Sequence, residues 1–598
     1  YARGMLIFFL ACDEPGTSDS ASPTPDEVSD VDGDGFSADQ GDCDDENADV
    51  FPDAPEACNG GDDNCDGQVD EDVELVFYLD ADGDGFGHPV ESFAGCEAPL
   101  GYVADASDCD DADPTTYPGA TDTRLDGIDQ DCSGADRDCF DSGALYEGSV
   151  TISGDEDLTW FCEDYGRISG NLLVMNRSTP DLAGLECLCE VRGGFRVWYS
   201  EGMTSLSGLS SLASVQRLEL IGDTTLISLA GLESLRQVDE IVLWDMASLA
   251  DISALANVAT PLVTLQLLEL PSLTTLAGLE GIPSTTILEV SNVPALQDVD
   301  GLIGLTEVST LQLANVPSLA KLDGLANLAS VGTLSIDGAA DLVSLGGMSS
   351  LSLLGDTSIN ACSSLVDVSP LAAIGDAVGS LVLTDNNQLA DLSPLSSLTE
   401  ADWLVLSGGG IYEISALAGL ESVGALELEL PLLTSVAPLS ALESANSILL
   451  DNTSVLSLDG LGSLSRLGGL YLVENAVLAD LSALSGLDST TVVVEDNDAV
   501  VSLYGFEGVD GSGSTKVYVR DNDGLLSLSG LEGVESLDTL ELDNNESLMD
   551  ISALALLTEV DEDFTITDNE ALPTASAEAL CLQVGRELAD CEILGNEN

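Results

Sequence analysis

The chain has 598 residues, of which 108 are acidic and only 14 are Lys or Arg, so its formal net charge is −94. That charge disfavours nucleic acids and anionic membranes as partners, because their phosphate groups would be repelled along the whole surface. The single histidine, His88, nearly excludes Ser-His-Asp, Cys-His and multi-histidine metal chemistry. Hydrophobic residues still make up 44% of the chain while aromatic residues make up 5%, which indicates many small aliphatic layers rather than a disordered acidic tail.

The first residues contain a short apolar segment, Met5–Ala11, that follows Arg3 and ends directly before Cys12. The segment resembles the end of a bacterial lipoprotein signal peptide, in which Cys12 would carry the lipid; an ordinary secretory signal is the alternative. It is far shorter than the ~20 apolar residues that span a bilayer. Residues 13–29 are rich in Pro, Ser and acidic residues and predict a flexible linker.

An acidic module follows at residues 30–141, and it repeats the pattern D-x-[DN]-x-[DS]-G. Alternate side-chain oxygens in a tight loop can surround one hard cation, and the glycine permits the sharp turn that brings them together. The sequence therefore predicts calcium as the cofactor. The side chains expected to bind it are Asp30, Asp32, Asp34, Asp62, Asn64, Asp66, Asp80, Asp82, Asp84, Asp129, Asp131 and Ser133.

One of these loops fits the complete twelve-residue calcium pattern, since Glu91 stands twelfth from Asp80 and the carbonyl of Phe86 takes the seventh position. In the first loop, Asp42, Asp44 and Asp45 are available to complete the ligand set. Residues 75–79 form an apolar run that favours a strand over the helix of an EF-hand. The competing interpretation is that the Asp-Gly clusters are only turns.

The segments DGDG, DCDD, YPGA and GIDQDC resemble, as a set, the MopE-type metal-binding repeat of bacterial surface proteins, with copies at residues 30–71 and 80–134. The family name is associated with copper. Because a copper site would require histidine and this chain has only His88, calcium remains the expected metal.

The chain has 14 cysteines, and an exported protein would form disulfides with most of them. One sequence does not determine the connectivity. Cys362 stands alone among the later repeats and is expected to be a buried free thiol. The preferred pairs within the MopE-like copies are Cys43–Cys65, Cys109–Cys132 and Cys58–Cys96, and two further pairs could close the ends of the second domain, namely Cys139–Cys162 and Cys581–Cys591.

Residues 142–598 repeat one apolar pattern with a mean period of about 23 residues, which is typical of a leucine-rich or related solenoid. An L-x-L pair predicts one short inward-facing strand per coil, and the apolar residues spaced by three predict a 3₁₀ or irregular outer wall. One coil is Leu218, Leu220, Leu226, Leu229, Leu232 and Leu235. The predicted fold is mainly β, a solenoid of about nineteen coils with a C-terminal cap, preceded by a small loop-rich module.

The coils at residues 386–398 and 543–557 resemble internalin-type leucine-rich repeats, whereas residues 168–194 are similar to receptor L domains. Both resemblances imply a right-handed solenoid used for recognition. The asparagine ladder of such repeats is present only in some coils, at Asn386, Asn475, Asn497, Asn522 and Asn545.

Large aromatic residues occupy strand positions that should point outward from the sheet, and exposed aromatic side chains are enriched where proteins bind ligands. Random placement of single exposed side chains is the alternative. The predicted ligand face consists of Trp198, Trp244, Trp403, Tyr471 and Tyr518, with Arg196 beside them.

Together these patterns predict a non-enzymatic protein of the bacterial outer membrane or cell surface, held by a lipid anchor or secreted. Calcium would order the acidic module as a spacer, and the solenoid would bind a protein or a polysaccharide. A structural coat or calcium-buffering protein is the alternative. A polysaccharide-cleaving enzyme is less favoured, because nothing marks one pair of carboxylates as acid and base.

Overall fold

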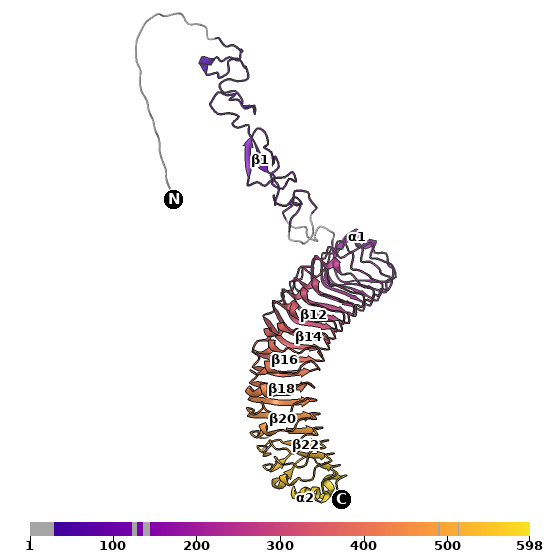
Figure 1. Ribbon diagram of the computed structural model, residues 1–598. Coiled ribbons are helices and arrows are strands. Elements are labelled where there is room, and N and C mark those ends of the chain that lie inside the picture. The colour runs from indigo at the N-terminus through magenta and orange to yellow at the C-terminus, as the bar shows by residue number, and fades with distance from the viewer. Residues whose placement is uncertain (1–28, 122–127, 135–143, 488–490, 512, 598) are drawn as a thin grey trace, which may run out of the picture. The chain divides into compact units, whose positions relative to one another are not determined.

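A computed structural model describes residues 29–121, 128–134, 144–487, 491–511 and 513–597 (Figure 1). The chain divides into two compact units, an acidic module that ends in the segment 128–134 and a solenoid that occupies residues 144–597. None of the described helices is long and apolar enough to cross a membrane.

The acidic module contains little regular structure. Its described residues contain one 3₁₀ turn, η1 (Ala38–Gln40), and a small antiparallel sheet of β1 (Leu75–Leu79), β2 (Ser92–Gly95) and β3 (Tyr102–Val103) in the order β2-β1-β3. The segment before Asp80 is thus a strand, as its apolar run predicted. In its described part, the only buried hydrophobic side chains are Val50, Ala54 and Phe77.

Disulfides replace the missing core of this module. A chain segment that buries so little apolar surface needs cross-links or bound metal to stay folded. The three pairs expected from the MopE resemblance are all present, namely Cys43–Cys65, Cys58–Cys96 and Cys109–Cys132.

The second unit is a solenoid built on one parallel sheet, which confirms the predicted fold. Paired residues of neighbouring strands lie 22 to 25 positions apart between β9 and β22. The 22 described strands of this sheet are β4 (Ala144–Tyr146), β5 (Val150–Ser153), β6 (Tyr165–Ile168), β7 (Leu172–Met175), β8 (Glu190–Trp198), β9 (Ser214–Ile221), β10 (Gln237–Trp244), β11 (Leu262–Leu268), β12 (Ser284–Ser291), β13 (Glu307–Ala314), β14 (Ser330–Asp337), β15 (Leu353–Asn360), β16 (Ala377–Thr384), β17 (Glu400–Ser407), β18 (Ser422–Glu429), β19 (Ser444–Asp451), β20 (Arg466–Val473), β21 (Thr491–Glu495), β22 (Lys516–Arg520), β24 (Thr539–Asp543), β26 (Phe564–Thr567) and β27 (Glu592–Leu594).

Short turns form the opposite wall of the coils, where apolar residues recur every third position, as the sequence predicted. A separate pair of short strands, β23 (Ser536–Leu537) and β25 (Glu559–Val560), lies beside the main sheet. The described 3₁₀ turns are η3 (Ser253–Leu255), η4 (Asp300–Leu302), η5 (Asp323–Leu325), η6 (Gly346–Met348), η7 (Ser369–Ile374), η8 (Ser393–Leu395), η9 (Ser415–Leu417), η10 (Ala437–Ala441), η11 (Ser482–Leu484), η12 (Ser552–Leu556) and η13 (Leu588–Asp590).

Aliphatic side chains fill the interior of every coil. In the coil of β9, the six residues from Leu218 to Leu235 that the sequence singled out are all fully buried. The same positions are buried in the coils that follow, so each leucine packs against its equivalents one coil before and one coil after. This stacking explains why a chain so poor in aromatic residues builds a continuous core.

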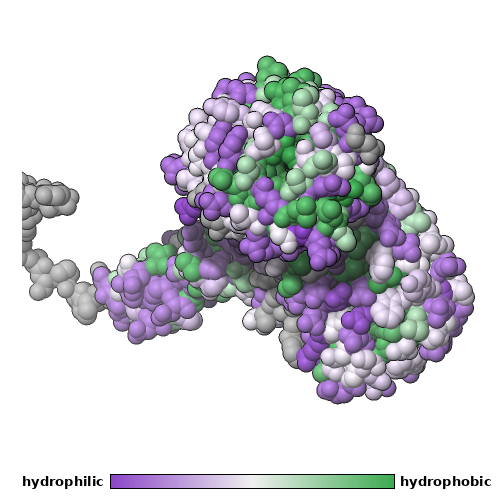
Figure 2. Space-filling model, turned by 90° about the horizontal axis from the view of Figure 1, so that it is seen from below, coloured by the Kyte–Doolittle hydropathy of each residue, from purple (hydrophilic) through white to green (hydrophobic). Residues whose placement is uncertain are grey.

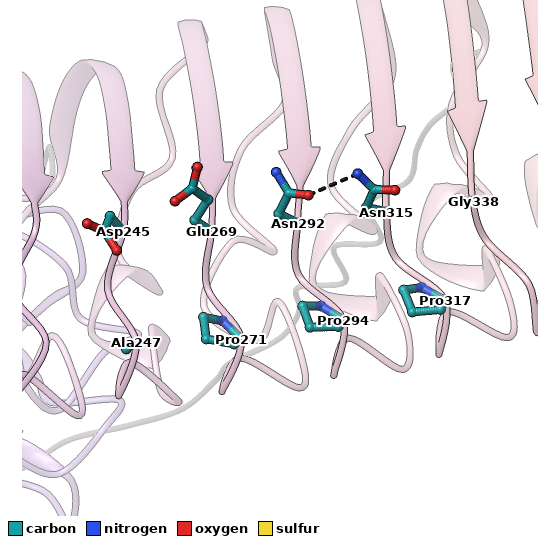
Figure 3. Close-up of a pocket in the computed structure, with 9 residues that line it drawn as sticks. All are labelled: Asp245, Ala247, Glu269, Pro271, Asn292, Pro294, Asn315, Pro317 and Gly338. Carbon is teal, nitrogen blue, oxygen red and sulfur yellow. Dashed lines mark hydrogen bonds between the residues drawn. The ribbon is translucent and has the colours of Figure 1, made fainter.

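A left-handed residue ends most strands and turns the chain into the outer wall. Asp245, Glu269, Asn292 and Asn315 have φ values between 52° and 57°, and Gly338 has a φ of 67°. A groove of about 470 Å³ runs beside these residues (Figure 3). Its other lining residues stand two positions further along each coil, and they are Ala247, Pro271, Pro294 and Pro317.

The residue that follows the left-handed residue is of a different type in the earlier and the later coils. In the coils of β10 to β14 this position holds aliphatic residues such as Met246 and Val316, whereas Cys362 occupies it in the coil of β15. In the coil of β16 it holds the predicted Asn386, which is buried and accepts the N–H of Cys362 at 3.1 Å. Further on it holds a continuous ladder of buried asparagines, Asn475, Asn497, Asn522, Asn545, Asn569 and Asn596. The sequence pattern located the ladder only as far as Asn545 and missed Asn569 and Asn596.

The first coils carry a disulfide that differs from the predicted one. Cys162 pairs with Cys187, not with Cys139, which lies outside the described residues. The helix α1 (Thr159–Asp164) places Cys162 beside the next coil, and Cys187 lies 25 residues later, about one period away. The Cys162–Cys187 bond therefore links neighbouring coils. Cys189 is also disulfide-bonded.

The last coil is closed by α2 (Thr574–Gln583) and β27, and the disulfide Cys581–Cys591 joins α2 to the residue directly before β27, as expected for a cap. Figure 2 shows this end nearest the viewer, with hydrophobic patches among hydrophilic residues. The exposed leucines of the cap are Leu582, Leu588 and Leu594.

Candidate functional site

The loops at Asp30 and Asp80 have the same local structure. In the second of them, Asp80 accepts the N–H of Gly83 through Oδ1 at 2.7 Å and the N–H of Gly85 through Oδ2 at 3.2 Å. Asp30 accepts the equivalent N–H groups of Gly33 and Gly35 at 2.7 and 3.0 Å. The glycines adopt positive φ, which is why the pattern requires them.

Each loop is closed by a DCDD segment from later in the same copy. Asp45 accepts the N–H of Val31 at 3.3 Å, and Asp111 accepts the N–H of Ala81 at 2.8 Å. Carboxylate oxygens of Asp80, Asp82 and Asp111 lie within 4.8 Å of one another, and so do those of Asp82, Asp84 and Asp108. The sequence foresaw this closure in the first copy only, for which it named Asp42, Asp44 and Asp45.

At each of the two loops, three buried carboxylate oxygens have no hydrogen-bond donor. Two of them come from the loop and one from the DCDD segment. They are the Oδ2 atoms of Asp32, Asp34 and Asp42 in the first copy, and of Asp82, Asp84 and Asp108 in the second. Buried charges need a partner, so this arrangement fits a cation at the centre of each loop. Loss of contact with water raises the pKa of Asp32, Asp82 and Asp108 above the ordinary value of 3.8.

The twelfth position of the Asp80 loop has a different place from the one predicted. Glu91 lies opposite the end of β1, where its carbonyl accepts the N–H of Leu79 at 3.0 Å, and it joins none of the carboxylate groups found among the described residues. Asp108 and Asp111 take its place, because the pairing of β1 with β2 carries the chain away from the loop. The ring of Phe86 stacks on the ring of Tyr117, with 5.6 Å between the two ring centres.

The remaining two loops form a second type. Asp62 accepts the N–H groups of Asp66 and Gly67, and Asp129 accepts those of Ser133 and Gly134. The Oε2 atom of Glu71 is buried without a donor beside the first of these loops. The residue pattern missed Glu71, which stands tenth from Asp62.

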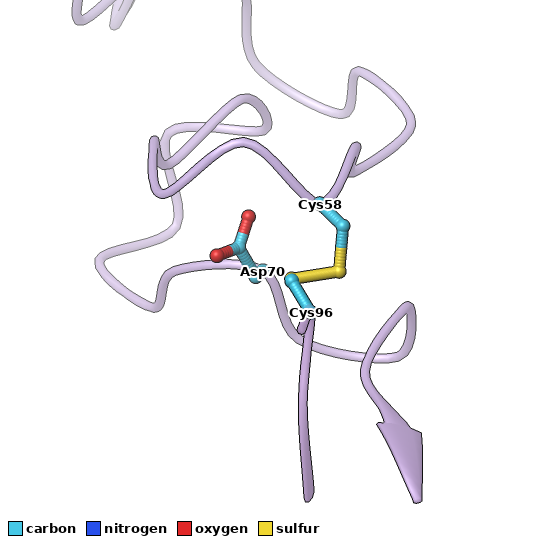
Figure 4. Close-up of side chains that lie close together, drawn as sticks. All are labelled: Cys58, Asp70 and Cys96. Carbon is cyan, nitrogen blue, oxygen red and sulfur yellow. A yellow bond between two sulfur atoms is a disulfide. The ribbon is translucent and has the colours of Figure 1, made fainter. Parts of the chain in front are cut away.

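Two groups combine cysteine sulfur with a carboxylate, but neither offers a thiolate. Cys58 and Cys96 are bonded to each other beside Asp70 (Figure 4), and Cys109 is bonded to Cys132 beside Asp108. Disulfide sulfur is a poor metal ligand compared with a thiolate. The donors that remain at these loops are oxygen atoms.

Four of the five predicted aromatic residues of the ligand face lie in two rows that cross the strands. A row is a set of residues aligned by strand register in successive coils. The first row is Trp198, Ile221, Trp244 and Leu268. The second row is Leu449, Tyr471, Val493 and Tyr518. Trp403 aligns with Ser380 and Ala425 instead and stands alone.

Charged groups flank both rows. Trp198 donates its indole N–H to Glu219 at 3.1 Å, and Glu219 also pairs with Arg217 at 2.7 Å. In the second row, the guanidinium of Arg520 lies 4.8 Å from the centre of the Tyr518 ring. The two rows thus combine flat apolar surface with some of the few cations of the chain.

Comparison with protein families matches two segments of the acidic module. Residues 42–71 and 108–138 match the MopE family model. That model, Cu-binding_MopE, is described as "Putative metal-binding motif". The matched segments contain the DCDD closures and the second type of loop, so both copies of the acidic module carry this metal-binding motif. No curated protein sequence matches the chain.

Solved structures similar to the solenoid are leucine-rich-repeat proteins. An internalin (inlF) from Listeria monocytogenes str. 4b F2365 is 19% identical, covering 47% of this chain and 87% of its own, with a TM-score of 0.26. The functional domain of InlJ from Listeria monocytogenes is 17% identical, covering 61% and 74%, with a TM-score of 0.28. A TLR13–ssRNA13 complex is 14% identical, covering 67% and 78%, with a TM-score of 0.27.

Proposed function

We propose that the protein is a non-enzymatic binding or adhesion protein of the cell surface, in which calcium orders the acidic module and the solenoid sheet binds an extracellular ligand. The observation that carries the metal part is the set of six buried carboxylate oxygens without donors. Without a cation these carboxylates repel one another, so the metal is expected to stabilise the module as a spacer.

Calcium fits these donors better than copper or zinc. The ligand atoms gathered at the loops are oxygens, which calcium prefers, whereas copper and zinc favour nitrogen and sulfur. The single imidazole, His88, accepts the N–H of Val90 through Nδ1 at 3.3 Å and belongs to none of the ligand groups in the described residues. The copper in the family name is therefore not carried over to this chain.

Export is part of the proposal. Disulfides of this number persist in oxidising compartments, which agrees with an extracellular module. The lipid anchor at Cys12 falls outside the described residues. It is tested by mass spectrometry of the membrane fraction from cells that express the chain, in which Cys12→Ser should abolish the lipid mass.

Calorimetric titration of the full chain tests the calcium sites. Asp34→Asn and Asp84→Asn each remove one buried carboxylate and should weaken binding by at least about tenfold. Asp39→Asn and Asp49→Asn, at exposed positions of the same module, serve as controls. Because protons compete for carboxylates whose pKa is raised, affinity should fall as the pH is lowered. A chain that takes up no calcium, or in which all four variants behave alike, would disprove the assignment.

The sheet face is tested with arrays of extracellular proteins and polysaccharides. Trp198→Ala or Trp244→Ala should weaken the binding of any ligand that contacts the first row. Trp160→Ala is the matched control, because Trp160 is 44% exposed compared with 43% for Trp244 but lies on α1. If all three variants bound the ligand equally well, the first row would be removed from the proposal. The assignment of the calcium sites would not be affected.

A further inference from the structure

The groove beside the left-handed residues of β10 to β14 is distinct from the sheet face. Asp245, Glu269, Asn292 and Asn315 form its polar wall, with their exposed side chains one coil apart (Figure 3). The series of left-handed residues from Asp245 to Gly338 spans four coil steps, or roughly 19 Å at the spacing of neighbouring strands. The groove is thus long and narrow rather than a closed pocket.

The floor of the groove is apolar and rigid. Pro271, Pro294 and Pro317 stand in successive coils on one line below the polar wall (Figure 3).

The series of left-handed residues continues beyond the N-terminal end of the groove, to Gly222 and Tyr199. A Cβ at Gly222 would lie 2.5 Å from the Tyr199 ring, so the ring covers Gly222, and Tyr199 is 61% exposed. Only glycine leaves room for the ring there.

The backbone N–H groups along the polar wall of the groove are already bonded within the sheet and are not offered to an extended peptide. The N–H groups of Asp245, Glu269, Asn292 and Asn315 all donate to carbonyls of the next coil, at 2.8 to 3.0 Å. The prolines have none. A peptide that adds a strand needs such donors, so recognition in this groove depends on side chains.

The side chains present favour hydroxyl groups. Each carboxylate accepts hydrogen bonds and each amide both donates and accepts, and Asn315 already donates to Asn292 at 2.9 Å. The net charge of −94 and the carboxylates of the wall would repel an acidic chain. An apolar floor with a few polar groups along one side matches the ordinary composition of ligand sites.

We infer that this groove binds a linear, neutral polysaccharide. Sugar hydroxyls bond to Asp245, Glu269 and the two asparagines, while the apolar faces of the sugar rings pack on the prolines and on Tyr199. The inference rests on the proposed function only in taking the solenoid as the ligand-binding unit. It goes beyond that function by adding a second binding place, separate from the sheet face, together with its class of ligand.

The test uses the full chain on arrays of neutral polysaccharides (β-glucan, mannan, galactan and xylan), with alginate and single-stranded RNA as acidic probes. The wild-type chain should bind at least one neutral polysaccharide and neither acidic probe. The double variant Asp245→Asn/Glu269→Gln should bind about tenfold more weakly. Tyr199→Ala is a second variant, and Ala361, with a φ of 53°, shows that alanine is tolerated in this backbone conformation.

The matched control is Asp496→Asn/Glu474→Gln. These residues hold the same left-handed position in later coils, with φ values of 55° and 54°, outside the groove. Absence of binding to every neutral polysaccharide, or equal weakening by both double variants, overturns the inference. Binding only to an acidic probe, or only to a protein ligand, also overturns it, and in the second case the proposed function stands.

Discussion

The buried asparagine ladder makes the strongest prediction about stability. Asn497 accepts the N–H of Asn475 through Oδ1 at 3.1 Å and donates through Nδ2 to the carbonyls of Leu472 and Glu495, at 2.8 and 2.7 Å. Both asparagines are fully buried. Replacement of Asn497 by alanine therefore removes three hydrogen bonds from the interior of the solenoid.

The cost of Asn497→Ala follows from what each partner retains. The N–H of Asn475 is left buried without an acceptor, which costs about 1–3 kcal/mol. The carbonyl of Glu495 keeps the N–H of Glu474 at 3.0 Å. We count each of the two lost carbonyl bonds at about 0.5–1.5 kcal/mol, the usual net value of one hydrogen bond. We expect the free energy of opening the coils around β20 and β21 to fall by roughly 2–6 kcal/mol.

Hydrogen exchange followed by mass spectrometry is the suitable assay, because long repeat arrays do not unfold as one cooperative unit. Amides of β20 and β21 should exchange at least about tenfold faster in Asn497→Ala. Asn327→Ala is the control, since Asn327 donates one exposed hydrogen bond, to the carbonyl of Ile303 at 2.9 Å. If both variants exchanged alike, the ladder would contribute no more than a surface hydrogen bond, and the reasoning would be refuted.

Three further predictions concern close packing, a thiol and pH. Gly324→Ala would place a Cβ 1.7 Å from the carbonyl oxygen of Val299 and should lower the melting temperature strongly, whereas Gly486→Ala meets no atom within 4 Å and should leave it nearly unchanged. Burial raises the pKa of Cys362 to about 11, so iodoacetamide should label this thiol only after unfolding, and labelling of the native chain would contradict the burial. Hydrogen bonds from Ser482 and Ser552 lower the pKa of Asp480 and Asp550. Their stabilisation is present above the unfolded value of 3.8 and is lost as the pH falls through the lower folded values. Hydrogen exchange, corrected for its intrinsic pH dependence, should therefore show that the coils of Asp480 and Asp550 open more easily as the pH falls from ~5 to ~3, and unchanged protection of these coils would contradict the assignment.

The sequence determined the repeating parts of this protein. The period of about 23 residues placed the strands, because an L-x-L pair fixes which face of each strand is buried. The D-x-D-x-D-G pattern placed the tight loops, because each contact within them joins residues no more than five positions apart. Contacts this local depend on residue type and spacing alone.

Contacts between coils or between distant loops required the tertiary structure. Between β9 and β22 the coil length varies from 22 to 25 residues, so only the strand register shows that Trp198 and Trp244 share a row and Trp403 does not. The partner of Cys162 depends in the same way on the place of α1 against the following coil.

The closure of the acidic loops has the same cause. Asp111 lies 31 positions after Asp80, and its approach depends on the small sheet and the disulfides between them, not on spacing in the chain. A linear pattern therefore favoured Glu91, which is closer in sequence, whereas the folded chain brings Asp108 and Asp111 to the loop.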